Sequence, residues 1–350
     1  MTKSKLTLII DGNWLMMSRM STLNGKYATT KSMMEDLKLL MIKSINVVLR
    51  TFQTIDNIIF VADGGSWRSK VEAPSFLVKD GVEYKGNRVR GDEIDWDVVF
   101  KEYENFWTLL KSTGINVFKE FGIEGDDWCW FLSRELNKEQ TNVVIWTKDR
   151  DLTQLVQTDK DGCFTSWWNK ENGVVFQEKD MDCTSFLLNP YYADNAKYEN
   201  DLMKNSVKTT YINPNAVVID KIIRGDQSDN IQPIILRNAK GNSDKKFRVS
   251  VKDIDYNLDP HDYDAVTGYL KGLLASKNYV GRVEQPYDKL VEHFVYNATI
   301  VCLDESSYPL NVYEKMYNHE PLVISKDTSL AEQKILAEKN NMSSILDSIF

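Results

Sequence analysis

Acidic residues repeatedly follow apolar runs in the first half of this sequence. Leu6–Ile10 runs into Asp11, and Asn57–Ala62 runs into Asp63. The runs Ile115–Phe118 and Asn142–Trp146 are soon followed by further acids. Together with a later pair in Arg224–Asn230, these residues form one candidate metal-binding set: Asp11, Asp63, Glu124, Asp126, Asp127, Asp149, Asp151, Asp226 and Asp229.

So many carboxylates, each close to the end of an apolar run, predict a site for divalent cations. Ionised carboxylates a few ångströms apart repel one another strongly unless cations lie between them. Hard oxygen ligands without histidine or cysteine select Mg²⁺ or Mn²⁺. The chain has three histidines, and all of them lie outside these segments: His261, His293 and His319. Taken singly, each acid could instead favour a loop or cap a helix, as Asp127 could. For the set as a whole we favour the metal site.

The apolar runs themselves predict the elements that position these acids. The four runs have the length and composition of strands, and helical patterns over Lys31–Phe52 and Ile94–Lys111 lie between them. Strands that alternate with helices predict an α/β fold with a mostly parallel central sheet flanked by helices. The C-terminal ends of parallel strands share one edge of a sheet, so we expect the acids to converge there.

The remaining segments are more varied. Gly65–Arg90 breaks the alternation and is interpreted as a long loop or a mobile helical element. Cys163–Phe176 contains two short aromatic runs around Asn169–Gly173, which predicts a β-hairpin. Composition changes near residue 185, and from Asn215 the pattern is largely helical to the end. Among the nine tryptophans, Trp107 is interpreted as core, and packing is favoured over base stacking for Trp14, Trp128 and Trp130.

Bulk composition excludes several classes of protein. The chain has 350 residues, 42% of them hydrophobic, which is enough for two domains with a sizeable core. No stretch approaches the ~20 apolar residues of a membrane span, and no secretory signal is evident. The four cysteines form no Cys-x-x-Cys pair and are expected to be free thiols in a reducing cytoplasm: Cys129, Cys163, Cys183 and Cys302. A net charge of −8 weakly disfavours a nucleic-acid partner, although bound metal ions would cancel much of it locally.

The ordered acidic motifs resemble those of the 5′-nuclease family, which includes flap endonucleases and the 5′-nuclease domains of bacterial DNA polymerases. The matching motifs are Ile-Ile-Asp11-Gly, Val-Ala-Asp63-Gly, Glu124-Gly-Asp126-Asp127, Asp149-Arg-Asp151 and Gly225-Asp226-x-x-Asp229. Trp67-Arg68, Tyr84-Lys85-x-x-Arg88 and the end of the chain, Ser344–Phe350, are similar to the bacteriophage ribonuclease H branch of that family. The segment Phe186–Asn215 has no counterpart, and the Gly-x-Gly-x-Lys run of most members is missing after Asp229.

The resemblance implies a domain plan and a set of site residues. Residues 1–185 would be a PIN-like nuclease core with an arch at about 64–92, and 186–216 an insertion. Residues 217–350 would be a helical domain with a helix–turn–helix-type DNA-binding element. Two Mg²⁺ (or Mn²⁺) ions are implied, with Asp126, Asp149, Lys85 and Arg88 as catalytic residues. Asp11, Asp63, Glu124, Asp126 and Asp127 would surround the first ion, and Asp149, Asp151, Asp226 and Asp229 the second. The implied nucleic-acid-binding residues are Arg68, Tyr84, Lys85, Arg88, Arg90, Arg237, Lys240, Lys245, Lys246 and Arg248.

The implied activity is 5′→3′ exonuclease and flap-endonuclease cleavage that removes RNA primers and 5′ flaps during phage-type DNA replication. Expected partners are DNA and RNA·DNA duplexes with a 5′ end, flap or nick, bound by a cytoplasmic monomer. The last residues, Ile345–Phe350, would dock on a sliding clamp or, as we prefer, pack on the core; a single-strand-binding protein is a further candidate partner. Three alternatives stay open: an inactive junction-binding adaptor, an aspartyl-phosphate phosphatase and a PIN-type ribonuclease. The reading Asp11-Gly-Asn13 disfavours the phosphatase, because that class needs Asp-x-Asp there.

Overall fold

The computed structural model describes residues 5–23, 25–52, 55–78, 84–88, 93–112, 115–177, 208–235, 248–283 and 286–319. The chain divides into two compact units. Unit 1 comprises Met1–Gly65, Gly91–Ile212 and Glu314–Phe350, and unit 2 comprises Ser66–Arg90 and Asn213–Tyr313. Residues 66–90, expected as an arch on the nuclease core, therefore group with the helical unit, and the chain returns to unit 1 at Glu314.

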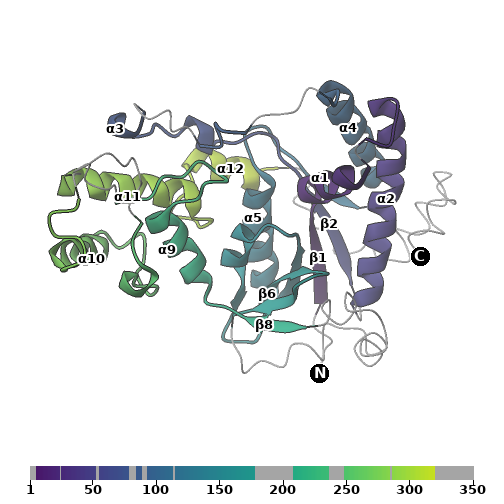
Figure 1. The fold of residues 1–350 in the computed structure, drawn as a ribbon. Coiled ribbons are helices and arrows are strands. Elements are labelled where there is room, and N and C mark those ends of the chain that lie inside the picture. The colour runs from purple at the N-terminus through teal and green to yellow at the C-terminus, as the bar shows by residue number, and fades with distance from the viewer. Residues whose placement is uncertain are drawn as a thin grey trace. The chain divides into compact units, whose positions relative to one another are not determined.

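Unit 1 is built on a mixed, mostly parallel sheet (Figure 1). Its described strands are β1 (Lys5–Asp11), β2 (Asn57–Val61), β3 (Asn116–Phe118), β4 (Thr141–Trp146), β5 (Gln157–Thr158), β6 (Phe164–Asn169), β7 (Gly173–Phe176) and β8 (Thr209–Tyr211). The order is β3-β2-β1-β4-β6-β7-β8, with β5 paired to β6. β1 lies between β2 and β4, parallel to both, with Ile10 beside Phe60 on one side and Trp146 on the other.

The helices of unit 1 cover both faces of this sheet. They are α1 (Gly12–Leu23), α2 (Thr30–Thr51), α4 (Trp96–Ser112) and α5 (Gly125–Lys138), with a 3-10 turn η2 (Asp151–Leu155). Figure 1 shows α1, α2 and α4 on one side of β1 and β2, and α5 on the other. The strands are therefore buried on both faces, which explains why they are almost continuous apolar runs in the sequence.

Unit 2 is helical among its described residues. It contains η1 (Arg68–Lys70), α3 (Ser75–Val78), α9 (Pro214–Arg224), η3 (Val251–Asp253), α10 (Tyr263–Ala275) and α11 (Tyr287–Val301), and α12 (Leu310–Tyr317) begins there. Its core includes Ile219, Ile222, Leu270 and Phe294, which are all fully buried. α9 starts at a favourable site, because the Asn213 side chain accepts a hydrogen bond from the Asn215 amide and Pro214 follows.

Most sequence-based elements are confirmed. The four strand runs, the two helical patterns and the hairpin around Asn169–Gly173 all occur within a few residues of their expected bounds. Two helices were not predicted as separate elements, α1 and α5, and each begins directly after an acidic residue, Asp11 and Glu124. The region expected as an insertion contributes β8, which pairs with β7 and extends the sheet.

Other expectations are only partly covered by the structure. Cys129, Cys163 and Cys302 are buried free thiols, whereas Cys183 lies outside the described residues. The segment after Ile235, where the helix–turn–helix element was expected, and the chain's end, Ser344–Phe350, also lie outside them. No described helix combines the length and the apolar character needed to cross a membrane.

Candidate metal centre

Asp11 ends β1 and is held in place from two sides. Its Oδ1 accepts a hydrogen bond from the Trp14 amide at 2.9 Å, and its Oδ2 accepts one from Thr147 Oγ1 at 2.9 Å. Trp14 lies in the first turn of α1, so Asp11 also caps that helix. Thr147 follows β4, the parallel neighbour of β1. The carboxylate is only 6% exposed as a result.

Asp63 is positioned by backbone contacts between the loops after β2 and β3. The Gly64 amide donates to Ile123 O at 2.7 Å, and the Gly122 amide donates to Gly64 O at 2.8 Å. A Cβ on Gly64 would lie 1.8 Å from Glu120 O, so only glycine permits this close approach. Asp63 Oδ1 then accepts a hydrogen bond from the Gly125 amide at 2.7 Å, at the start of α5.

The acidic motif before α5 forms a capping box. Glu124 is the N-cap, its side chain accepts from the Asp127 amide, and Asp127 Oδ2 accepts from the Glu124 amide at 2.8 Å. Asp127, named above as a possible N-cap, is therefore the third residue of the helix, and it is fully buried. Asp126 lies between them in the first turn, where the helix dipole favours a negative charge.

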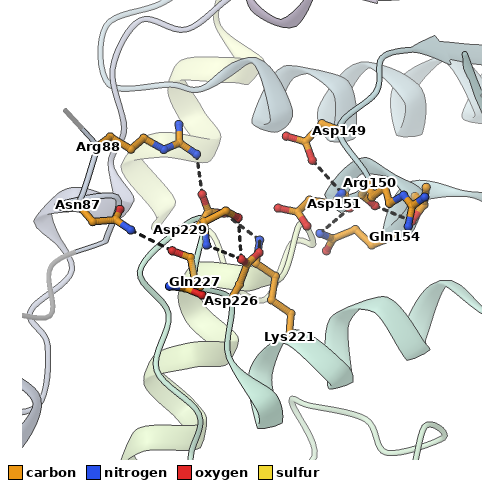
Figure 2. Close-up of polar contacts among 12 residues, drawn as sticks. Asn87, Arg88, Asp149, Arg150, Asp151, Gln154, Lys221, Asp226, Gln227 and Asp229 are labelled. Carbon is orange, nitrogen blue, oxygen red and sulfur yellow. Dashed lines mark hydrogen bonds and ion pairs between the residues drawn. The ribbon is translucent and has the colours of Figure 1, made fainter. Parts of the chain in front are cut away.

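Asp149 and Asp151 lie in the loop after β4. The Asp149 amide donates to Thr147 Oγ1 at 3.0 Å, and the Asp149 carbonyl accepts from Trp167 Nε1 at 2.9 Å. Its side-chain Oδ1 accepts from the Asp151 amide at 2.9 Å, a contact drawn in Figure 2. Thr147 thus connects this loop to Asp11, because one hydroxyl bonds both residues.

Electrostatics indicate that four of these carboxylates converge within unit 1. The pKa of Asp11 is raised to about 7, chiefly by burial and also by the charges of Asp63 and Asp149, against the hydrogen bonds from Trp14 and Thr147. Burial also raises the pKa of the Cys129 thiol on α5, and the charges of Asp11, Asp126, Asp149 and Asp63 raise it to decreasing extents. These four acids, from three strand ends and α5, are therefore near enough to Cys129 for their charges to act on it.

The donor set fits a hard divalent cation. The groups that meet around Asp11 are carboxylates, and their mutual repulsion is the property that a bound cation would relieve. The nearby Cys129 stays protonated because burial raises its pKa, so it does not offer the thiolate that softer metals prefer. The donor set is therefore one that hard, oxygen-preferring divalent cations bind.

Asp226 and Asp229 form a second acidic site in unit 2, and it is organised around a lysine. Lys221 Nζ lies 2.9 Å from Asp226 Oδ2 and 2.8 Å from Asp229 Oδ2 (Figure 2). The loop is closed by reciprocal backbone hydrogen bonds between Asp226 and Ile231, at 2.9 and 2.7 Å. Gly225 has a φ of +70°, which only glycine adopts readily, and a Cβ there would lie 2.5 Å from Ile231 O.

The predicted substrate-binding segment 84–88 contacts this loop. The Lys85 amide donates to Asp229 O at 3.0 Å, and Arg88 lies 2.6 Å from Asp229 Oδ1. Asn87 Nδ2 donates to Gln227 O at 2.9 Å (Figure 2). Burial alone would raise the pKa of Asp229, but the charges of Lys221, Lys85 and Arg88 outweigh it and the pKa is lowered.

The other predicted nucleic-acid-binding residues have different environments. Tyr84 is half-buried against the unit 2 core, with Lys85 Nζ 4.9 Å from its ring centroid. Arg68 is only 2% exposed and packs on the rings of Trp67 and Tyr308, which does not favour the expected phosphate contact. Arg248 is exposed. The remaining basic residues lie outside the described residues: Arg90, Arg237, Lys240, Lys245 and Lys246.

Two site residues were not singled out from the sequence. Thr147 was given no role from the sequence, and only the pairing of β1 with β4 shows that it bonds Asp11. Lys221 is a basic residue on an otherwise apolar helix, five residues before Asp226. This position just ahead of the acidic motif was the signal that could have identified it. The packing interpretation is confirmed for Trp107, Trp128 and Trp130, which are buried, whereas Trp14 is partly exposed.

The fold defines the class of protein: an α/β protein with a mostly parallel sheet flanked by helices, with acidic residues after its strands. Residues 6–183 match the family model of the 5′-3′ exonuclease N-terminal resolvase-like domain. The chain therefore belongs to the 5′-3′ exonuclease family.

Two similar proteins are each described as a 5′-3′ exonuclease. The chain is 25% identical over 242 residues to the 5′-3′ exonuclease of Mycoplasmopsis pulmonis, covering 69% of this chain and 65% of that protein. It is 28% identical over 116 residues to the 5′-3′ exonuclease of Buchnera aphidicola, covering 33% of this chain and 37% of that protein. The chain thus spans less than two thirds of the length of these curated relatives.

The matching solved structures include two nucleic-acid complexes. The flap endonuclease of bacteriophage T5, crystallised with DNA and metal ions, is 17% identical, with a TM-score of 0.48 and coverage of 98% of this chain and 100% of that one. The catalytic core of Rad2 in complex with DNA substrate is 12% identical, with a TM-score of 0.38 and coverage of 100% and 94%.

Proposed function

We propose that this protein is a divalent-metal-dependent, structure-specific 5′-nuclease. It would cleave phosphodiester bonds near the 5′ end of a DNA strand or an RNA primer and leave a 5′-phosphate and a 3′-hydroxyl. The observation that carries this proposal is the convergence of Asp11, Asp63, Asp126 and Asp149 in unit 1, together with the raised pKa of the buried Asp11. Membership of the 5′-3′ exonuclease family supports it.

Each acidic residue has a proposed role. Asp11, Asp63 and Asp126 would hold one cation, and Asp149 and Asp151 would contribute to holding the other. Asp226 and Asp229 of unit 2 are proposed as metal ligands on the family resemblance alone. Glu124 and Asp127 use carboxylate oxygens in the capping box of α5, so we propose them as supports that aim Asp126. When bound, two such ions supply Lewis acidity to the scissile phosphodiester and to water.

Basic residues would hold the nucleic acid. Lys85 and Arg88 would contact the phosphate that is cut, and Tyr84 would stack on a base of the same strand. Arg248 and its basic neighbours between residues 237 and 246 would grip the duplex backbone without reading its bases. Replication factors such as a sliding clamp or a single-strand-binding protein would recruit the nuclease to primers and flaps.

The test compares one variant with a matched control. Labelled flap, nicked and RNA-primed duplexes are incubated with wild-type protein, Asp149→Asn and Asp161→Asn, in Mg²⁺ and in excess chelator. Asp161 is an exposed aspartate in the same unit, outside the acidic cluster. We expect Mg²⁺-dependent cleavage by the wild type and by Asp161→Asn. Asp149→Asn should bind duplex but lose cleavage, because the carboxylate acts in the chemical step.

Three outcomes would overturn the proposal. Cleavage that persists in excess chelator would exclude the metal mechanism, and full activity of Asp149→Asn would exclude its role. Duplex binding without cleavage under any metal would favour the junction-binding adaptor. The relative rates on the three substrates would also show whether RNA primers or DNA flaps are preferred.

A further inference from the structure

A pocket of about 360 Å³ lies in unit 1 beside the acidic cluster. α1 contributes Trp14 and Arg19, and the loops after β4 and β6 contribute Lys148 and Lys170. From α2 come side chains that share one face of the helix, since they are spaced three or four residues apart: Leu40, Lys43, Ser44, Val47 and Val48. Its volume is at the lower end of the range for ligand-binding pockets, which suits a single small aromatic ligand.

The pocket has an aromatic wall. The Trp14 and Trp146 rings meet edge to face with centroids 5.8 Å apart, and Trp146 contacts Trp168 at 6.1 Å. Trp146 and Trp168 are buried, at 3% and 1% exposure, whereas Trp14 is partly exposed. The buried Trp146 ring, which is itself backed by Trp168, therefore contacts Trp14, and Trp14 is the ring that can stack on a bound base. Such a stack is worth the most when the protein ring is already ordered.

Positive charge is concentrated in the same pocket. Four basic side chains line it, Arg19, Lys43, Lys148 and Lys170, against one acid, Glu171, which is paired with Lys148. This balance is opposite to the net charge of the whole chain, −8. The Arg19 Nε is buried and has no hydrogen-bond acceptor among the described residues. A buried donor without an acceptor is costly, and a ligand oxygen would satisfy it.

The pocket is physically connected to the acidic cluster. Trp14 donates its amide to Asp11, and Lys148 directly precedes Asp149. Asn169, a further lining residue, donates to Thr147 O at 3.4 Å, and the Thr147 hydroxyl bonds Asp11. A strand whose phosphate lies at the carboxylates would therefore have a neighbouring nucleotide within reach of the pocket.

We propose that this pocket binds one nucleotide of the strand that is cleaved, with its base stacked on Trp14 and its phosphate facing Arg19 and Lys43. Aromatic stacking with basic side chains is the chemistry that single-stranded nucleic acid requires, and it tolerates any base. The inference rests on the proposed nuclease function. It adds a subsite that would hold the strand in register relative to the acidic cluster.

Photocrosslinking identifies the occupant. Flap oligonucleotides that carry 5-iodouracil at one position each, near the 5′ junction, are bound to the full-length protein in Ca²⁺ and irradiated. One position should crosslink to the peptide that contains Trp14. An abasic residue at that position should weaken binding about fivefold or more, as loss of one stacked base does. In Trp14→Leu the same abasic residue should have no further effect.

Charge variants keep the test valid if Trp14→Leu folds poorly. Lys43→Glu should weaken binding of the flap oligonucleotide at least tenfold, and its dependence on salt should decrease. Lys31→Glu is the matched control, because Lys31 is exposed on the same helix about 18 Å from Lys43 at 1.5 Å per residue and does not line the pocket. Its effect should be less than twofold.

Several results would overturn the inference. Crosslinks that map outside the pocket, equal crosslinking at all positions, or equal effects of Lys43→Glu and Lys31→Glu would each do so. If free thymidine monophosphate binds at Trp14 but no strand position crosslinks there, the pocket binds free nucleotides, and the proposal of a strand subsite is wrong. Failure of the nuclease proposal can be told apart from failure of this inference. In that case no cleavage is seen in Mg²⁺, whereas crosslinking in Ca²⁺ persists.

Discussion

Replacing Lys221 by methionine would test how the acidic loop of unit 2 is held. The Lys221 side chain is 10% exposed and contacts Asp226 and Asp229, whose side chains are 25% and 8% exposed. Methionine keeps much of the apolar stem and removes the ammonium. Asp229 would then be a buried carboxylate with one partner fewer.

The expected cost follows from burial. Removing one member of a fully buried ion pair costs about 3–5 kcal/mol. Here the loss should be smaller, because Arg88 still lies 2.6 Å from Asp229 and Asp226 can recover water. We expect about 2–3 kcal/mol, discounted from that range. For a protein of this size the melting temperature should fall by roughly 3–4 °C.

The assay is thermal unfolding followed by circular dichroism, with and without Mg²⁺. Arg224→Met is the matched control on α9, since its pair with Asp220 at 3.0 Å is more exposed and should contribute only about 0.3–0.5 kcal/mol. Mg²⁺ should stabilise Lys221→Met more than the wild type, because the two carboxylates are then open to a cation. If Lys221→Met melts within about 1 °C of Arg224→Met, the loop is held by other contacts and this reasoning is wrong.

Three further predictions concern separate parts of the molecule. Lys85→Ala should lower the single-turnover cleavage rate by about 10²-fold with a smaller change in affinity; a large loss of affinity alone would make Lys85 only a binding residue. Gly64→Ala should destabilise unit 1 by at least about 2 kcal/mol in urea unfolding, because the new Cβ would lie 1.8 Å from Glu120 O. Gly268→Ala, in open space on α10, should be neutral or stabilising, and equal effects would refute the steric argument. The His261–Asp304 pair, at 2.7 Å, should stabilise unit 2 by about 1 kcal/mol or less, given solvent screening. The hydrogen bond to Asp304 raises the pKa of His261 against the effect of burial, so this stability is fully present below the ordinary value of 6.5 and is lost as the pH rises through the folded-state pKa. Burial alone would raise the pKa of Asp304, but the hydrogen bond from His261 outweighs that effect and the pKa is lowered. Stability is therefore also lost as the pH falls below the ordinary value of 3.8. His261→Gln should therefore lower the melting temperature near pH 5.5 and not near pH 9, and a pH-independent effect would contradict the assignment.

Local sequence was sufficient for the strands and for the position of the acids at their ends. β1, β2 and β4 are short apolar runs that are buried on both faces, and each leads to an acidic residue. Strand identity depends on nearest neighbours and on burial, which such runs report directly. The parallel arrangement then followed from the alternation with helices, and with it the shared edge where Asp11, Asp63 and Asp149 lie.

Only the tertiary structure decided what each acidic residue does. Asp11 and Asp127 have the same side chain in similar motifs, yet Asp11 meets other carboxylates while Asp127 closes a capping box. The pairing of Lys221 with Asp229 and the burial of Arg68 against Tyr308 likewise depend on how helices and loops pack. The reason is that charge and hydrogen bonding act over a few ångströms in space. Thr147 and Asp11 are separated by 136 positions in the sequence, and only the pairing of β1 with β4 brings them together.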